Sequence, residues 1–146
     1  MRNAALPALV LAAACIGCGE TAASAAGDTY VLRSIAGDAL PAVFTESDAV
    51  RVRILADTLV LADDRTGHEV QRLETLTAVD GSLQTYRSVV TLTWSVRDGR
   101  LEIAYDCPDF ASCIAPPHLA GAATAAGLTF DQSLGRAPLV FERIPG

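Results

Sequence analysis

A strict alternation of apolar and polar residues in the second half of the chain is the feature that most restricts its fold. Every second residue of Val90–Val96 is apolar, with Thr or Ser between, and Leu101–Tyr105 repeats the pattern. Asp98-Gly99 separates the two runs, and this dipeptide favours the positive φ angles of a tight hairpin turn. A period of two predicts two antiparallel strands, each with one buried and one solvent-facing side.

The same period recurs along most of the chain after residue 27. The segment 69–79 has apolar residues at helical spacing, but its β-branched residues and the Asp80-Gly81 that follows favour a strand. Asp57 is interpreted as a turn residue between two strands. The further segments that we predict as strands are 30–35, 50–54, 59–61, 119–124, 128–131 and 139–144.

Eight to ten short strands separated by turns, with no convincing crossover helix, predict an all-β fold. We expect a single antiparallel β-barrel of about eight strands over residues 28–146, with a β-sandwich as the alternative. Barrel closure is favoured because it leaves no exposed sheet edge.

The first 17 residues are typical of an export signal. Arg2 supplies a positive start and an uncharged apolar stretch covers 4–14. That stretch is shorter than the ~20 residues that span a bilayer, so we expect cleavage and not a retained membrane helix. The sequence therefore predicts an exported protein of the cell envelope.

The residues Leu11–Gly19 resemble the lipobox of bacterial lipoproteins, in which a cysteine is lipidated and becomes the new amino terminus. Cys18 follows a small Gly17 and is preferred, with Cys15 as the alternative. The resemblance implies a signal peptide over 1–17, attachment to the membrane through the N-terminal lipid, and a flexible tether over 18–27. The alternative is a plain signal peptide cut after Ser24-Ala25-Ala26.

Two further cysteines, Cys107 and Cys113, lie close together in a turn-rich segment. Because an exported protein meets oxidising conditions, we expect them to form a disulfide. The alternative is a metal site that adds His118, although five intervening residues exceed the usual zinc spacing and no fourth ligand is evident. No metal and no cofactor are therefore predicted.

Charge and motif content exclude several classes of function. Seventeen acidic residues stand against 11 Arg and no Lys, which gives a formal net charge of -6. Because nucleic-acid affinity depends on clustered positive charge, a nucleic-acid partner is not expected. The chain has none of the common hydrolase, metalloprotease, phosphate-loop or dinucleotide motifs, so we do not predict an enzyme.

The segment Tyr30–Pro41 resembles the opening strand and turn of small bacterial lipoproteins with lipocalin-like or META-type β-barrel domains. The chain has Asp28-Thr29 before Tyr30, where secreted lipocalins have a Gly-x-Trp. The resemblance implies a noncatalytic barrel that binds a small apolar ligand or an envelope protein. An alternative is an envelope stress factor or enzyme inhibitor that acts through the loop from Cys107 to His118.

Three aromatic residues fall in phase with apolar neighbours in the predicted strands, either as core residues or as candidate lining of a ligand cavity. They are Tyr30, Trp94 and Tyr105.

Overall fold

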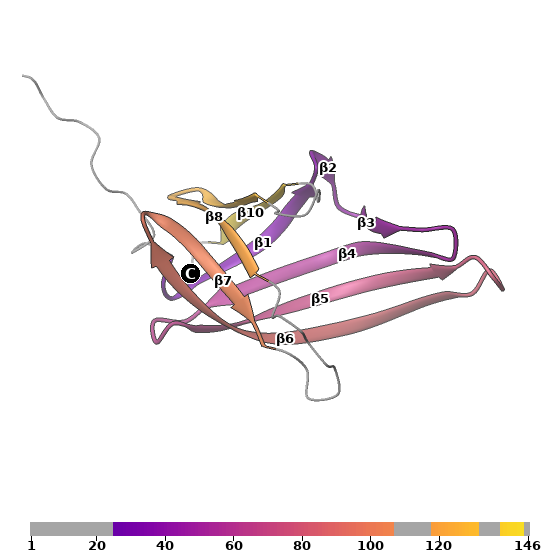
Figure 1. Ribbon diagram of the computed structural model, residues 1–146, viewed down its shortest axis with the longest axis horizontal. Coiled ribbons are helices and arrows are strands. Elements are labelled where there is room, and N and C mark those ends of the chain that lie inside the picture. The colour runs from indigo at the N-terminus through magenta and orange to yellow at the C-terminus, as the bar shows by residue number, and fades with distance from the viewer. Residues whose placement is uncertain (1–24, 107–117, 132–137, 145–146) are drawn as a thin grey trace, which may run out of the picture.

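The computed structural model describes residues 25–106, 118–131 and 138–144, which form ten strands and no helix (Figure 1). All neighbouring strands are antiparallel. Their bounds are β1 Asp28–Ile35, β2 Asp38–Ala39, β3 Ala42–Glu46, β4 Val50–Leu61, β5 Thr66–Thr77, β6 Leu83–Arg97, β7 Arg100–Tyr105, β8 His118–Thr124, β9 Gly127–Asp131 and β10 Leu139–Ile144.

Eight of these strands close into a barrel. The sheet runs β2-β1-β10-β9-β8-β7-β6-β5-β4-β3, and an additional pairing between β1 and β4 closes the ring. This confirms the predicted single antiparallel barrel of lipocalin-like architecture over the sandwich alternative. The segment 69–79, which could have been helical, is largely β5.

The hairpin between β6 and β7 follows the prediction from its turn residues. Asp98 and Gly99 both have positive φ, at 50° and 75°, which is the requirement of a two-residue hairpin turn. The register then places Trp94 opposite Ile103, so that both side chains point to the same face of the sheet. This face is the interior of the barrel.

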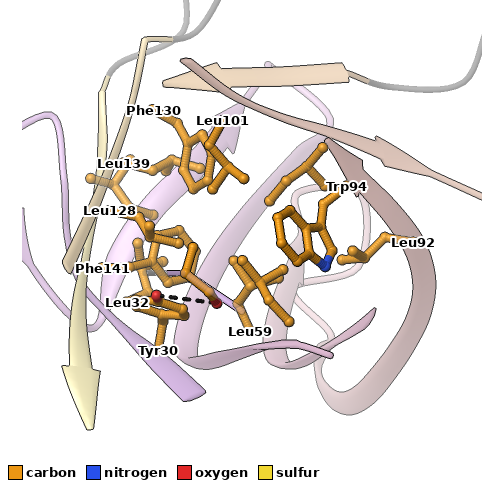
Figure 2. Close-up of a cluster of buried hydrophobic side chains, with 14 of the residues drawn as sticks. Tyr30, Leu32, Leu59, Leu92, Trp94, Leu101, Leu128, Phe130, Leu139 and Phe141 are labelled. Atoms are coloured by element: carbon orange, nitrogen blue, oxygen red, sulfur yellow. Dashed lines mark hydrogen bonds between the residues drawn. The ribbon is translucent and has the colours of Figure 1, made fainter. Parts of the chain in front are cut away.

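The barrel interior is filled by large apolar side chains at one end (Figure 2). Phe130 and Phe141 meet edge to face with ring centroids 5.8 Å apart. The Trp94 indole Nε1 donates a hydrogen bond to the Ala62 carbonyl oxygen at 3.0 Å, which satisfies its one polar atom. Other side chains that are less than 2% exposed here include Tyr30, Leu32, Leu59, Leu92, Leu101, Ile103 and Leu128.

Three strands continue beyond the barrel as an arm. The second half of β4 pairs with β1 and closes the barrel, whereas its first half pairs with β3. We call residues 50–54 of β4, 73–77 of β5 and 83–87 of β6, together with β3, the arm. Figure 1 shows these strands extending past the rest of the barrel.

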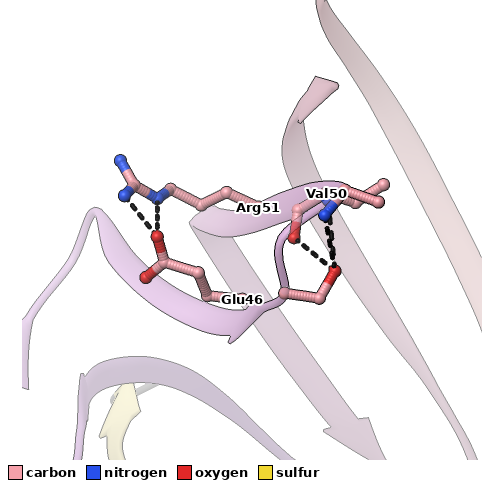
Figure 3. A network of polar contacts seen from close by, with 5 residues as sticks. Glu46, Val50 and Arg51 are labelled. Carbon is pink, nitrogen blue, oxygen red and sulfur yellow. Dashed lines mark hydrogen bonds and ion pairs between the residues drawn. The ribbon is translucent and has the colours of Figure 1, made fainter. Parts of the chain in front are cut away.

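The turn between β3 and β4 holds these two strands of the arm together (Figure 3). The Ser47 hydroxyl oxygen accepts hydrogen bonds from the backbone N–H groups of Ala49 and Val50 at 3.3 and 3.1 Å. Beside this turn the Arg51 guanidinium forms an ion pair with Glu46 across the two strands. These contacts hold β3 along the edge of β4, where it lies beside the interior residue Ile54.

The last residues of the predicted tether pack against the barrel. Ala25 is only 1% exposed and belongs to the core, and its carbonyl oxygen accepts a hydrogen bond from the Tyr30 hydroxyl at 3.5 Å. The Gly27 N–H donates to the Leu61 carbonyl oxygen at 2.7 Å. The packed domain therefore begins before residue 28.

Candidate functional site

The inner face of the sheet becomes progressively exposed from the barrel toward the arm. Along β6, Trp94 is 7% and Leu92 1% exposed, Val90 and Ser88 are half-buried, and Tyr86 is 46% exposed. The register places all five on the inner face. The barrel is thus packed at one end and accessible at the end where the arm begins, which we call the open end.

β4 and β5 stay more buried than β6 at the same level. Tyr86 lies opposite Leu73, which is 9% exposed, and Leu73 lies opposite Ile54, which is 1% exposed. Ile54 in turn lies opposite Ala42 of β3, which is 4% exposed and ends this row of paired inner-face residues. Solvent therefore reaches the open end from the β6 side.

Polar side chains gather on the inner face at the open end. Asp57 of β4 lies opposite Gln71 of β5, and Glu69 lies two residues farther along β5, beside Val90. Asp57 is 1% and Glu69 5% exposed, and they are the two buried charged or polar residues in the described ranges. We call Asp57, Glu69, Gln71 and Tyr105 the polar cluster.

Hydrogen bonds connect the polar cluster. The Gln71 side-chain Nε2 donates to Asp57 Oδ2 at 2.9 Å and to Glu69 Oε1 at 3.2 Å. The Tyr105 hydroxyl lies near the Glu69 carboxylate. Asp57 Oδ1 receives no hydrogen bond from any residue that the structure describes. A buried carboxylate oxygen without a donor is costly, so this atom needs a proton or a partner.

Burial raises the pKa of both acids. Loss of water raises the pKa of Asp57 to about 9, and the nearby Glu69 carboxylate adds to the effect. Burial likewise raises the pKa of Glu69. It also raises the pKa of Tyr105, and the Glu69 charge beside the hydroxyl raises it further. The two acids consequently hold a proton between them at neutral pH, as closely spaced carboxyls do.

The positive side chains near the cluster in sequence do not neutralise it. Arg53 lies on the outer face and pairs with Glu74 at 3.0 Å. Arg72 and His68 alternate with Gln71 and Glu69 along β5, so they also point outward. Within the described part of the chain, the two acids therefore form a buried acid pair that no internal salt bridge neutralises.

The three aromatic residues singled out from sequence occupy different environments. Tyr30 and Trp94 lie in the packed end, where they fill the core. Tyr105 is half-buried and belongs to the polar cluster. Only Tyr105 among the three therefore lies at the open end.

Several sequence predictions fall outside the described residues. They concern lipidation at Cys18 or Cys15 and the disulfide between Cys107 and Cys113. Of the loop proposed as an inhibitory element, His118 is described, and it is the first residue of β8, opposite Ala104.

Sequence reasoning missed Asp57, Glu69 and Gln71. The interpretation of Asp57 as a turn residue was wrong, because Asp57 lies within the continuous strand β4. A bulge between Ile54 and Ala56 changes the phase of this strand, which concealed that Asp57 faces inward with Leu59. The inward position of Glu69 could have been predicted, since it is four residues from the buried Leu73 on the same strand and therefore faces the same side.

A second feature lies on the outer face of the barrel. It is a shallow depression over β6, β7 and β8, and its lining consists of Thr93, Ser95, Arg97, Glu102, Ala104, His118 and the exposed part of Trp94. Arg97 and Glu102 of this lining form an ion pair at 3.7 Å. This depression contains no buried polar atom that needs a partner, so the polar cluster is the stronger candidate site.

The structure also bears on metal binding and membrane spanning. Within residues 25–106, 118–131 and 138–144 there is no group of three or more His, Cys, Asp or Glu side chains that could hold a metal ion. The same ranges include no helix with the length and apolar character needed to cross a membrane.

The fold and the polar cluster define a closed β-barrel with a buried acid pair at its open end. Comparison with known proteins adds no relative, since no family model, no curated protein and no solved structure matches the chain.

Proposed function

We propose that this protein is a lipid-anchored lipoprotein of the cell envelope whose barrel binds a small, largely apolar ligand without transforming it. The observation that carries the proposal is the open end, where half-buried apolar side chains and the polar cluster lie together on the inner face. Small-molecule sites combine an apolar lining with a few polar groups that fix orientation, and barrel mouths are frequent locations for them.

The packed end of the barrel leaves the open end as the place for a ligand. Tyr30, Phe130 and Phe141 are each no more than 1% exposed and fill the interior there. Tyr86, at 46% exposure, is by contrast a large aromatic side chain on the inner face with much of its surface uncovered. A ligand seated against Tyr86 and Val90 would bury apolar area, at roughly 25 cal/mol per Å².

The proposed role of the polar cluster is noncatalytic. The group that links the two carboxyls is the Gln71 amide, which donates to Asp57 Oδ2 at 2.9 Å and to Glu69 Oε1 at 3.2 Å. The four members of the polar cluster include no nucleophile–base pair such as Ser–His or Cys–His. Carboxylate, amide and hydroxyl groups of this kind orient a bound ligand through hydrogen bonds.

The packing of Ala25 supports processing upstream of it. Cleavage after Ala26 would remove a residue that is 1% exposed in the core and the carbonyl to which Tyr30 donates. Cleavage before Cys18 or Cys15 would leave this contact intact. The proposed anchor is a lipid on Cys18, with Cys15 as the alternative, at the end of a tether that leads into Ala25.

Palmitate labelling tests the anchor. We expect label in the wild-type chain expressed with its leader, and loss of label in Cys18→Ser, with Cys15→Ser as the matched variant. Lipid attachment requires the cysteine thiol, so Ser at the correct position abolishes labelling without changing side-chain size appreciably. An unlabelled wild-type protein would refute the anchor, and label lost only in Cys15→Ser would move it to that residue.

Native mass spectrometry tests ligand binding. The mature chain, with Cys18→Ser to prevent lipidation, is purified from its source without detergent, and we expect a fraction to carry a small-molecule adduct. Tyr86→Ser should reduce that fraction at least about fivefold, because an aromatic contact of 1 kcal/mol or more is lost. Val89→Ser is the control, since Val89 is 54% exposed on the opposite face of the same strand. Protein without adduct in every preparation, or an equal effect of both substitutions, would contradict the proposal.

A further inference from the structure

We propose that the ligand of the open end carries a protonated amine, whose ammonium group binds Asp57 and Glu69 while its apolar part lies along β5 and β6. This inference rests on the proposed function and names the chemical class of its ligand.

The polar cluster has more acceptors than donors. Its two carboxyls present four oxygens, and the side chain that donates to them is the Gln71 amide. Asp57 Oδ1 remains without a donor although Asp57 is 1% exposed. An ammonium group brings three N–H donors and no acceptor, and so supplies what the cluster lacks. A carboxylate or phosphate ligand would add acceptors and negative charge to a site that already has too many of both.

The positive charge of an ammonium ligand also complements the acid pair. Among the described Arg residues, Arg143 is the one that the strand register places on the inner face, opposite Tyr30. Its guanidinium group already forms an ion pair with Asp28 at 2.8 Å. Arg53, Arg72 and His68 point to the outer face. The acid pair therefore has no cationic partner among the described residues, and a charge-assisted hydrogen bond from a ligand is stronger than one from a neutral group.

The walls of the open end suit an amine with an apolar body. Tyr105 lies beside Glu69, and Tyr86 is on the same inner face nearer the arm. Aromatic faces attract cations as well as apolar groups. Leu73 and Val90 supply apolar surface between the two tyrosines. The expected ligand is consequently an alkyl or aryl amine, with its head at Asp57 and its body toward Tyr86.

Binding of an ammonium group should displace the proton that the pair holds. That proton leaves to solvent, and the N–H donors of the ligand replace it at the carboxyl oxygens. The titratable groups facing Asp57 are Glu69 on β5 and Tyr105 on β7, with Tyr86 farther out on β6. Affinity should therefore increase with pH up to about 9, the pKa of Asp57 in the folded chain, because less work is then needed to remove the proton.

Calorimetry with octylamine and 1-octanol tests this inference on the mature Cys18→Ser chain. The two probes share an apolar tail and differ in the head group. At pH 7.5 we expect octylamine to bind at least about tenfold more tightly than octanol, the effect of one charged hydrogen bond. Titration in buffers of different ionisation enthalpy should show release of close to one proton for each octylamine bound.

Three variants sharpen the result. Asp57→Asn and Glu69→Gln keep side-chain shape and should bring the two affinities within about threefold of each other. Asp64→Asn removes the same charge at an exposed turn, where Asp64 accepts from Thr66, and should leave the preference unchanged. A thermal melt of each variant verifies folding before titration.

The outcomes separate this inference from the proposed function. Equal affinity for both probes in the wild-type chain would overturn the amine assignment and leave an apolar site in place. No binding of either probe, with the purified protein also empty, would count against both. An amine preference that survives in both Asp57→Asn and Glu69→Gln would place the head group elsewhere and overturn the inference.

Discussion

Replacing Asp57 by Asn should make the folded protein more stable above neutral pH, by a few kcal/mol. Burial and Glu69 hold the pKa of Asp57 near 9 in the folded chain, against 3.8 as its ordinary value. Above pH 4 the unfolded chain thus loses this proton while the folded chain keeps it. Each pKa unit corresponds to roughly 1.4 kcal/mol, so the wild-type protein should lose stability as pH rises from about 4 to 9. Asn has no proton to lose and can still hydrogen-bond to Gln71.

Thermal melts between pH 5 and 9 measure this effect. We expect the wild-type Tm to fall across the range and the Asp57→Asn Tm to fall less, with a gap of roughly 10 °C at pH 9. Asp64→Asn is the control: hydrogen bonds from Thr66 lower the pKa of Asp64, which is the opposite direction. A wild-type chain that becomes more stable with pH, or an Asp57→Asn chain less stable than wild type at pH 9, would show that the pair is not protonated.

The barrel could be predicted from sequence because strand periodicity and turn chemistry act locally. The alternation around Trp94 determined which residues face inward, and Asp98-Gly99 determined the hairpin register. The three C-terminal strands were likewise placed within one residue of β8, β9 and β10. In these segments local preference and tertiary packing favour the same structure.

The polar cluster could not be predicted in the same way. Its members are brought together by the bulge before Ala56, which reverses the phase of β4 and turns Asp57 inward. A bulge is an insertion of one residue into a ladder, and its position depends on the partner strand. The contact of Glu69 with Tyr105 depends further on the curvature of β5, β6 and β7 into a barrel. Neither dependence is visible in a single strand.

A second large effect is expected from Gly121→Ala, which should destabilise the barrel by about 3 kcal/mol or more and lower its Tm by 10 °C or more. Gly121 of β8 lies opposite Leu101 and Phe130 on the inner face. A Cβ atom there would lie 2.1 Å from the Thr129 carbonyl oxygen and 2.8 Å from the Phe130 Cα. Both are backbone atoms, so β8 and β9 would have to separate to accept one methyl group.

The neighbouring residue Ala122 provides the matched control for this substitution. It is exposed on the opposite face of β8, and Ala122→Ser should change the Tm by no more than a few degrees. Phe130→Leu added to Gly121→Ala should not restore stability, because the closest clash is with backbone and not with the phenyl ring. A Gly121→Ala chain that melts like wild type would mean that β8 and β9 are farther apart than described. The packed end would then have room for a ligand, and binding would no longer be confined to the open end.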